Sequence, residues 1–163
     1  MADLDLVLAK QHLRVLNSDE DAIIQQYLDA ATLDVERISG DLLTRREVTQ
    51  TFSAFGSWLP LNWGPLPEDV TISYFDSDDA AQEIADARIV RNRAYPNTDA
   101  WPEIYTDSQI SMTYTAGWEE PPADLIDAVL VLVGGKFDQR EGAYADALRA
   151  AESICGRNRT MMV

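Results

Sequence analysis

The stretch "MTYTAGWEEPPADL", residues 112–125, holds the end of a strand and the start of a helix. Large side chains alternate with threonine up to Gly117, which is the period of a half-buried strand. Pro122 suits the first turn of a helix, where its missing N–H costs nothing. The run "LIDAVLVLV" at 125–133 is apolar nearly all round, which predicts a buried helix. We therefore expect a defined strand-to-helix corner in this stretch.

Outward from this corner, apolar side chains recur at three- and four-residue steps in four segments. This spacing predicts helices over 4–16, 20–39, 122–140 and 142–154. In the first helix, Leu6, Leu13 and Leu16 are expected to share one apolar face. Gly134 and Gly135 each lower the helix propensity of the third by about 1 kcal/mol. They predict close packing, inside the subunit or against a neighbour, or a bend in the helix.

The segment 44–118 has a different character, with short β-branched and aromatic runs between turn residues. It predicts a small antiparallel β-element inserted between helices. The expected fold class is therefore α+β, mainly α: a small bundle of about four helices with that β-element inserted. We expect one domain over 1–156 and a flexible C-terminal tail over 157–163.

The net charge is the strongest property of the composition. The 163 residues carry a formal charge of -15, and residues 51–120 hold twelve acidic residues against three arginines. An acidic surface repels phosphate, so we expect no specific grip on nucleic acid. No apolar run reaches the roughly 18 residues that would predict a membrane span, and we expect no membrane partner.

Catalytic residue types are scarce. His12 is the only histidine and Cys155 the only cysteine, so a zinc site and a Ser-His-Asp triad are both improbable. The acidic "DSDD" at 76–79 lacks the glycine and glutamate spacing of a calcium-binding EF-hand loop. We expect no catalytic residue, no cofactor and no metal, although sequence leaves a pair of carboxylates facing across a cleft open.

Several segments, taken in order, resemble the head–tail connector, or adaptor, family of tailed double-stranded DNA phages and gene transfer agents. They are "LAKQHLRV" at 8–15, "DAIIQQYLDAATLDVERISG" at 21–40, "LPLNWGPLPEDVTISYFDSD" at 59–78, "ISMTYTAGWEEPPADLIDAVLVLV" at 110–133 and "REGAYA" at 140–145. The most specific part is "YTAGW" followed by "PADL" and the buried helix. The chain departs from the family where members often carry an aromatic residue late in that helix, since Gly134 and Gly135 stand there, followed by Phe137.

The resemblance implies a structural virion protein of the neck, assembled in the host cytoplasm, and no enzyme. It implies a homo-oligomeric, dodecameric ring beneath the portal protein, which extends the DNA channel and provides a platform for stopper or tail-completion proteins. DNA passes through such a ring without specific binding. The alternative is a monomeric virion binding module, such as a tail-terminator or host-surface protein.

Two groups of candidate interaction residues follow from these expectations. The basic and then apolar tail is a candidate partner contact that orders on docking, through Arg157, Arg159, Met161, Met162 and Val163. The candidates for the channel lumen or the subunit interface are Asp76, Asp78, Asp79 and Trp101.

Overall fold

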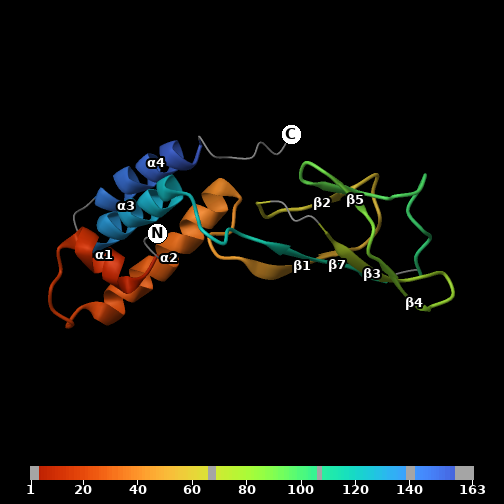
Figure 1. Ribbon diagram of the computed structural model, residues 1–163, viewed down its shortest axis with the longest axis horizontal. Helices are drawn as coiled ribbons and strands as arrows, with labels where there is room; N and C mark the ends of the chain where they lie inside the picture. The colour runs from red at the N-terminus through yellow and green to blue at the C-terminus, as the bar shows by residue number, and fades with distance from the viewer. Residues whose placement is uncertain (1–3, 66–68, 106–107, 139–141, 157–163) are drawn as a thin grey trace. The chain divides into compact units, whose positions relative to one another are not determined.

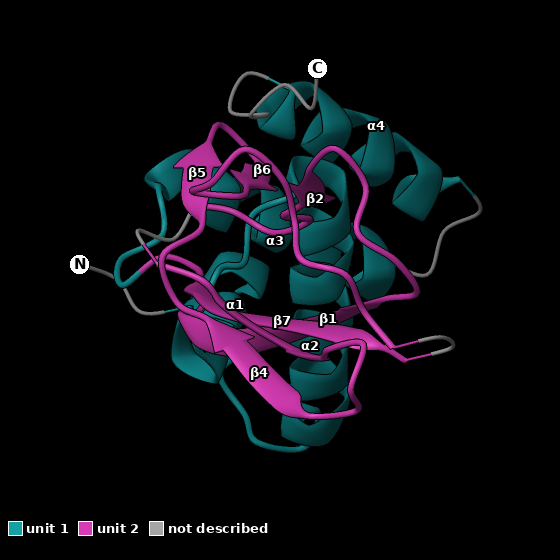
Figure 2. Ribbon diagram, turned by 90° about the vertical axis from the view of Figure 1, so that its right-hand side faces the viewer, with its two compact units in different colours: residues 1–43, 119–161, 163 teal, residues 44–118, 162 magenta. Residues whose placement is uncertain are grey.

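The computed structural model describes residues 4–65, 69–105, 108–138 and 142–156, and these form two compact units (Figures 1 and 2). Unit 1 is built from the chain up to Leu43 and from Glu119 onward. Unit 2 is built from Thr44 to Trp118. Unit 2 is thus an insertion in the sequence of unit 1, and each unit has buried residues of its own.

The prediction of a mainly helical bundle with a small β-element is wrong. In the described residues, four helices account for 38% of the structure, and seven strands in two antiparallel sheets account for 24%. Five of the seven strands are only two to five residues long. Runs this short show too few alternations to be recognised as separate strands from sequence, whereas helical periodicity accumulates over several turns.

Unit 1 contains the four helices, which are labelled in Figure 1: α1 (Leu6–Leu13), α2 (Asp21–Ser39), α3 (Ala123–Phe137) and α4 (Ala143–Cys155). Their buried side chains recur at helical spacing and form its core. The core residues are Ala9 in α1; Ile24, Leu28, Ala31 and Val35 in α2; Leu125, Ala128, Val129, Leu132 and Val133 in α3; and Ala147, Ala151 and Cys155 in α4.

The first helix ends earlier than its apolar pattern predicts. Arg14 adopts a left-handed conformation with φ 59°, and its N–H bonds back to the Gln11 carbonyl oxygen, which closes α1 after Leu13. The chain after this turn no longer follows the helical spacing of α1. Leu16 therefore leaves the expected apolar face and is 99% exposed.

The glycine pair in α3 makes two different contacts. A Cβ atom added at Gly135 would overlap the Ala147 Cβ and lie 3.2 Å from the Ala143 carbonyl oxygen. The helices α3 and α4 therefore approach closely there. A Cβ atom added at Gly134 would meet only the His12 Nε2, at an ordinary 3.6 Å. Close packing within the chain therefore explains Gly135 but not Gly134.

A polar network joins the helices beside this contact. The Tyr144 hydroxyl donates to the Asp34 Oδ2 at 2.8 Å, and the Lys136 ammonium lies 3.2 Å from the same oxygen. Lys136 also lies 4.2 Å from the centroid of the Tyr144 ring. Burial alone lowers the pKa of Lys136, but the hydrogen bonds to Tyr144 and Asp34 outweigh it and leave that pKa above its ordinary value. One carboxylate thus ties α2 to both α3 and α4.

We predict opposite stability effects at the two glycines. Gly135→Ala forces α3 and α4 apart and should lower the free energy of unfolding by about 1–3 kcal/mol. Gly134→Ala is the matched control, with the same added methyl group but room for it, and should raise stability by up to about 1 kcal/mol through helix propensity. Urea unfolding of both variants measures the difference. Equal effects would show that the α3–α4 contact is not tight.

Unit 2 contains two antiparallel sheets. The four-stranded sheet has the order β1 (Arg46–Phe52), β7 (Ile110–Ala116), β3 (Thr71–Phe75), β4 (Ala81–Ile84). The three-stranded sheet has the order β2 (Leu59–Pro60), β6 (Arg93–Tyr95), β5 (Arg88–Val90). The central strand β7 pairs with β1. In this ladder Thr49 lies opposite Thr113, so the two partners are more than sixty positions apart in the sequence.

One face of the four-stranded sheet is buried. Ile72, Ile110 and Met112 have no exposed surface there, and Tyr114 is 3% exposed. The Tyr114 hydroxyl accepts from the Trp63 N–H at 3.3 Å and lies 2.5 Å from the Gln50 Oε1. Burial is the main reason that the pKa of Tyr114 lies above its ordinary value. These bonds fix the segment after β2 against the sheet.

Gly117 brings the two ends of unit 2 together. It has φ +110°, and a Cβ atom there would overlap the Thr44 carbonyl oxygen and lie 2.7 Å from the Arg45 Cα. The Arg45 N–H donates to the Trp118 carbonyl oxygen at 3.1 Å beside this contact. Only glycine combines this backbone conformation with so close an approach.

We predict that Gly117→Ala destabilises the protein more than Gly142→Ala does. Both glycines have positive φ, so both variants carry backbone strain of about 1–3 kcal/mol. Nothing lies within 4 Å of a Cβ atom at Gly142, whereas at Gly117 the added methyl group also displaces Thr44. Thermal unfolding should give the lower Tm for Gly117→Ala. A Tm equal to that of Gly142→Ala would contradict the clash.

Candidate functional site

The described part of the chain has no arrangement that resembles a metal centre. It contains no group of three or more His, Cys, Asp or Glu residues placed to hold a metal ion. His12 lies exposed on α1, and Cys155 is buried at the end of α4. Burial, helped by the charge of Asp124, raises the pKa of the Cys155 thiol, which disfavours the reactive thiolate. Among the described helices, none has both the length and the apolar character needed to cross a membrane.

The acidic turn between β3 and β4 is ordered by one of its own carboxylates. The Asp76 Oδ1 accepts from the backbone N–H groups of Asp78 and Ala80, each at 3.0 Å, and its Oδ2 accepts from the Gln82 amide at 2.7 Å. Asp79 occupies the left-handed region with φ 60°. Asp76 is thus a turn-forming residue, whereas the side chains of Asp78 and Asp79 lie exposed in the turn.

The same hydrogen bonds lower the pKa of Asp76. The bond from Ala80 contributes most, followed by that from Gln82. Because the folded-state pKa is depressed, the carboxylate contributes its stabilisation above the unfolded value of roughly 3.9. That contribution is lost as the pH falls through the lower, folded-state value.

We predict that Asp76→Asn lowers Tm at neutral pH and that the difference from the parent protein shrinks on acidification below about pH 4. At low pH the Asp76 carboxylate of the parent protein becomes protonated and loses its charge, which the Asn variant lacks at every pH. Thermal unfolding of both proteins between pH 2 and pH 7 provides the measurement. A difference that stays constant over this range would show that the charge of Asp76 has no part in ordering the turn.

Trp101 lies within an aromatic cluster of unit 2. Its ring stacks on Phe55 with centroids 4.8 Å apart and planes 7° apart, and Phe55 packs edge-on against Tyr74 at 5.7 Å. Its Nε1 is buried without a hydrogen-bond partner. An isolated β-bridge joins Asp76 to Ile104, so the segment that follows Trp101 runs beside the acidic turn. The predicted tail residues Arg157, Arg159, Met161, Met162 and Val163 lie outside the described residues.

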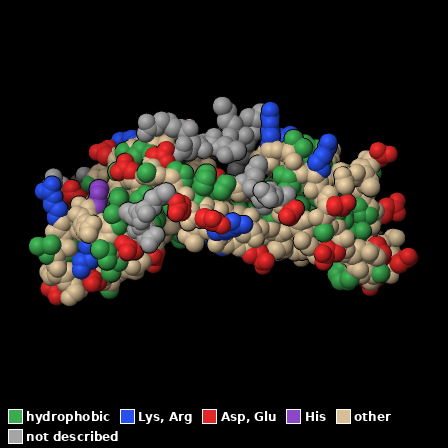
Figure 3. Space-filling model, viewed as in Figure 1, with side chains coloured by type: hydrophobic (Ala, Val, Ile, Leu, Met, Phe, Trp, Pro, Cys, Tyr) green, Lys and Arg blue, Asp and Glu red, His purple; other side chains and the backbone are tan. Residues whose placement is uncertain are grey.

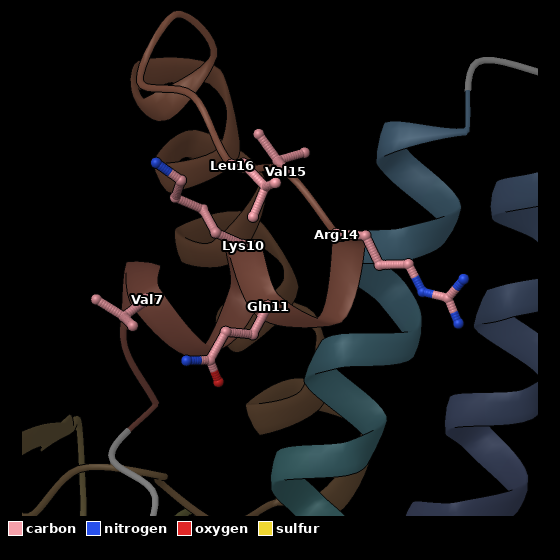
Figure 4. A pocket seen from close by; sticks show the side chains of 6 residues that line it. All are labelled: Val7, Lys10, Gln11, Arg14, Val15 and Leu16. Atoms are coloured by element: carbon pink, nitrogen blue, oxygen red, sulfur yellow. The ribbon is translucent and has the colours of Figure 1, made fainter.

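A shallow groove of about 510 Å³ along α1 was not predicted from sequence (Figure 4). Val7, Lys10 and Gln11 project from the helix, Arg14 extends in another direction, and Val15 and Leu16 follow the helix end. Lys10 forms an ion pair with Asp21 at 2.5 Å. Val7 is 60% exposed. The groove depends on the left-handed turn at Arg14, for which sequence carries no strong signal, because glycine and asparagine are the usual residues there.

No protein-family model matches the chain, and no curated protein matches it in sequence. Solved structures do match. A chain in the structure described as the neck of an empty GTA particle, computed with C6 symmetry, is 25% identical with a TM-score of 0.77, over 97% of this chain and 90% of that chain. The abbreviation stands for gene transfer agent.

Two further structures share the fold. A chain from the virion of a native gene transfer agent particle is 24% identical with a TM-score of 0.79, over 97% of this chain and 90% of that one. A chain from the neck of a native GTA particle, computed with C12 symmetry, is 20% identical with a TM-score of 0.70, over 100% of this chain and 94% of that one. The likeness therefore covers both units and nearly the whole of each matching chain.

Proposed function

We propose that this protein is a structural component of the neck of a gene transfer agent or related phage-like particle. Within the neck it acts as the head–tail connector, or adaptor, which forms a ring beneath the portal, extends the DNA channel and receives the stopper or tail-completion protein. The supporting observation is the match to a chain of a GTA neck, over 97% of this chain at 25% identity. A match of this extent leaves no large part of the fold unaccounted for.

The ring is supported by the symmetry of the matching particles. Two of the necks are described with C6 and C12 symmetry, and cyclic symmetry requires every subunit to repeat the same contacts. A subunit of one defined shape meets this requirement, and the tight contacts at Gly117 and Gly135 restrict the shape of each unit. We infer that this chain assembles in the same manner, with copies of itself.

The charge distribution is compatible with a conduit for DNA. Acidic side chains are spread over the face seen in Figure 3, in keeping with the net charge of -15. A channel protein that bound phosphate strongly would hold the DNA in place, because each phosphate neutralised by a lysine or arginine adds affinity. The exposed Asp78 and Asp79 remain our candidates for the lumen or for a neighbouring subunit, and residues 157–163 for docking on the portal.

The test is electron microscopy of the purified protein mixed with its own portal ring. We expect added density below the portal that follows a cyclic symmetry. A bare portal at saturating protein would contradict the connector role and favour a monomeric binding module elsewhere in the virion.

A variant ending at Gly156 serves as the matched comparison for the tail. It should keep the described fold and lose affinity for the portal if residues 157–163 make the contact. Undiminished binding by the shortened protein would remove the tail from the proposal and leave the connector role intact.

A further inference from the structure

All three basic residues of the segment 51–120 lie in one hairpin of unit 2. They are Arg88 in β5, Arg93 in β6 and Arg91 in the turn between these strands. The same segment holds twelve acidic residues, yet none of them stands in β2, β5, β6 or that turn. The three-stranded sheet is therefore a basic element within an acidic segment.

Two of these arginines share one face of the sheet with aromatic and apolar side chains. Residues that lie opposite each other in an antiparallel ladder point to the same side. The register places Arg88 opposite Tyr95 and Val90 opposite Arg93. Ala94, between the two β6 residues of this face, points to the other side and is buried.

Aromatic rings hold the guanidinium groups on this face. The Arg93 Cζ lies 4.3 Å from the centroid of the Trp58 ring, and the Arg88 Cζ lies 5.6 Å from that of Tyr95. Arg88 is exposed, and Val90 and Trp58 are 43% and 36% exposed. We call this surface, with the adjoining turn, the arginine face, and it consists of Trp58, Arg88, Val90, Arg91, Arg93 and Tyr95.

The composition of the arginine face is that of a protein-binding surface. Trp, Tyr and Arg are the residue types most enriched among those that dominate protein–protein binding energy. Within the described part of the chain, no ion pair involves Arg88 or Arg91, so both charges are available to a partner. A partner that fits offers carboxylates together with aromatic or apolar side chains.

The region around the β3–β4 turn offers the exposed aromatic side chains. The Tyr105 N–H donates to the Phe75 carbonyl oxygen at 3.0 Å, and the β-bridge between Asp76 and Ile104 is the next pair along the same two segments. Phe75 and Tyr105 therefore lie opposite each other on one side of the sheet. They are 45% and 46% exposed.

Exposed carboxylates accompany these two rings. Asp78 and Asp79 lie in the turn that follows Phe75, and Glu83 pairs with Ser73, which puts it on the same side of the sheet as Phe75. No lysine or arginine occurs in β3, in β4 or in the turn between them. We call this surface the acidic–aromatic patch, and it consists of Phe75, Asp78, Asp79, Glu83 and Tyr105.

The two surfaces lie at different edges of unit 2. In Figures 1 and 2, β2 and β5 run along the upper edge of this unit and β4 lies along its lower edge. One unit thus presents two unlike surfaces of complementary charge. A contact between unlike surfaces of two copies is heterologous, and it generates a ring when the rotation closes.

We propose that the arginine face of one copy binds the acidic–aromatic patch of the next copy around the ring. This inference rests on the proposed function and adds which surfaces of the chain make a contact between subunits. The opposite charges select the partner and fix its register, and the exposed rings supply apolar area. The C6 and C12 symmetries of the matching necks are the arrangements that repeated contacts of this kind produce.

The first test reverses the charge of one surface at a time. Arg88→Glu with Arg91→Glu makes the arginine face acidic, and Asp78→Arg with Glu83→Arg makes the acidic–aromatic patch basic. Each variant alone should bind its own portal ring with at least about tenfold lower apparent affinity than the parent protein, because like charges then face each other between copies. Native mass spectrometry counts the copies on each portal.

An equimolar mixture of the two reversed variants is the decisive comparison. In an alternating ring each reversed surface meets the other reversed surface, and the two unaltered surfaces also meet, so every contact is complementary again. Such alternation needs an even number of copies, as in C6 and C12 rings. We expect the mixture to reach the parent number of copies per portal, which also shows that both variants are folded.

The matched control is Asp29→Arg with Glu152→Arg, which makes the same change of charge at exposed positions of unit 1. This variant should assemble alone like the parent protein. Normal assembly of either reversed variant alone, or a mixture that assembles no better than its components, would overturn the proposed contact.

The second test is photo-crosslinking on the portal with a mixture of isotope-labelled and unlabelled protein. A p-benzoylphenylalanine side chain replaces Val90 in one protein and Ile23, an exposed residue of α2, in the control. From position 90 we expect crosslinks to peptides of a different copy that contain residues 71–84 or 104–105. Crosslinks from position 90 to other regions alone would overturn the pairing.

The two proposals fail differently in these experiments. If the parent protein does not bind the portal, the proposed function is wrong and the contact falls with it. If the parent protein and both reversed variants assemble equally, only the pairing of the two surfaces is wrong. Double-stranded DNA is the other acidic partner that suits arginine, and an Arg88→Glu, Arg91→Glu variant that loses DNA binding but keeps its ring would assign the arginine face to DNA instead.

Discussion

The close approach of Gly117 to Thr44 is the contact on which the insertion of unit 2 depends. A chain that leaves unit 1 at Leu43 and re-enters it at Glu119 must bring the two ends of the inserted segment together. The Arg45–Trp118 hydrogen bond joins these ends, and a side chain at 117 would prevent it. The β1–β7 ladder begins at the very next pair, Arg46 and Ala116, so the register of the central strand starts from this contact.

Unit 1 is also held by a close contact at a glycine, and polar bonds lie beside that contact. The missing side chain at Gly135 lets α4 approach α3, and the Asp34 carboxylate bonds to Lys136 and Tyr144 beside that contact. Three helices are thus held by one close backbone approach and one shared carboxylate. In the ring that we propose, such contacts matter because small differences in shape accumulate around the circle.

The contacts at Gly117, Gly135 and Asp34 restrict the shape of each unit. The surfaces away from these contacts are available for assembly. The exposed apolar side chains of Val7 and Leu16 and the serine and threonine side chains on β1, β7 and β3 differ in chemistry. The Asp76 carboxylate forms the β3–β4 turn through its hydrogen bonds to Asp78 and Ala80.

The sequence by itself determined the local features: a strand ending before Gly117, a buried helix after Pro122, and the acidic charge of the surface. These depend on spacing, residue type and neighbours within a few positions. Only the tertiary structure decided the balance of strand and helix, the pairing of β7 with β1 and β3, and the gathering of Thr49, Thr71 and Thr113 on one face. In these ladders the paired residues lie between 38 positions (Ser73 with Ser111) and 70 positions (Arg46 with Ala116) apart in the sequence. No local pattern carries that information.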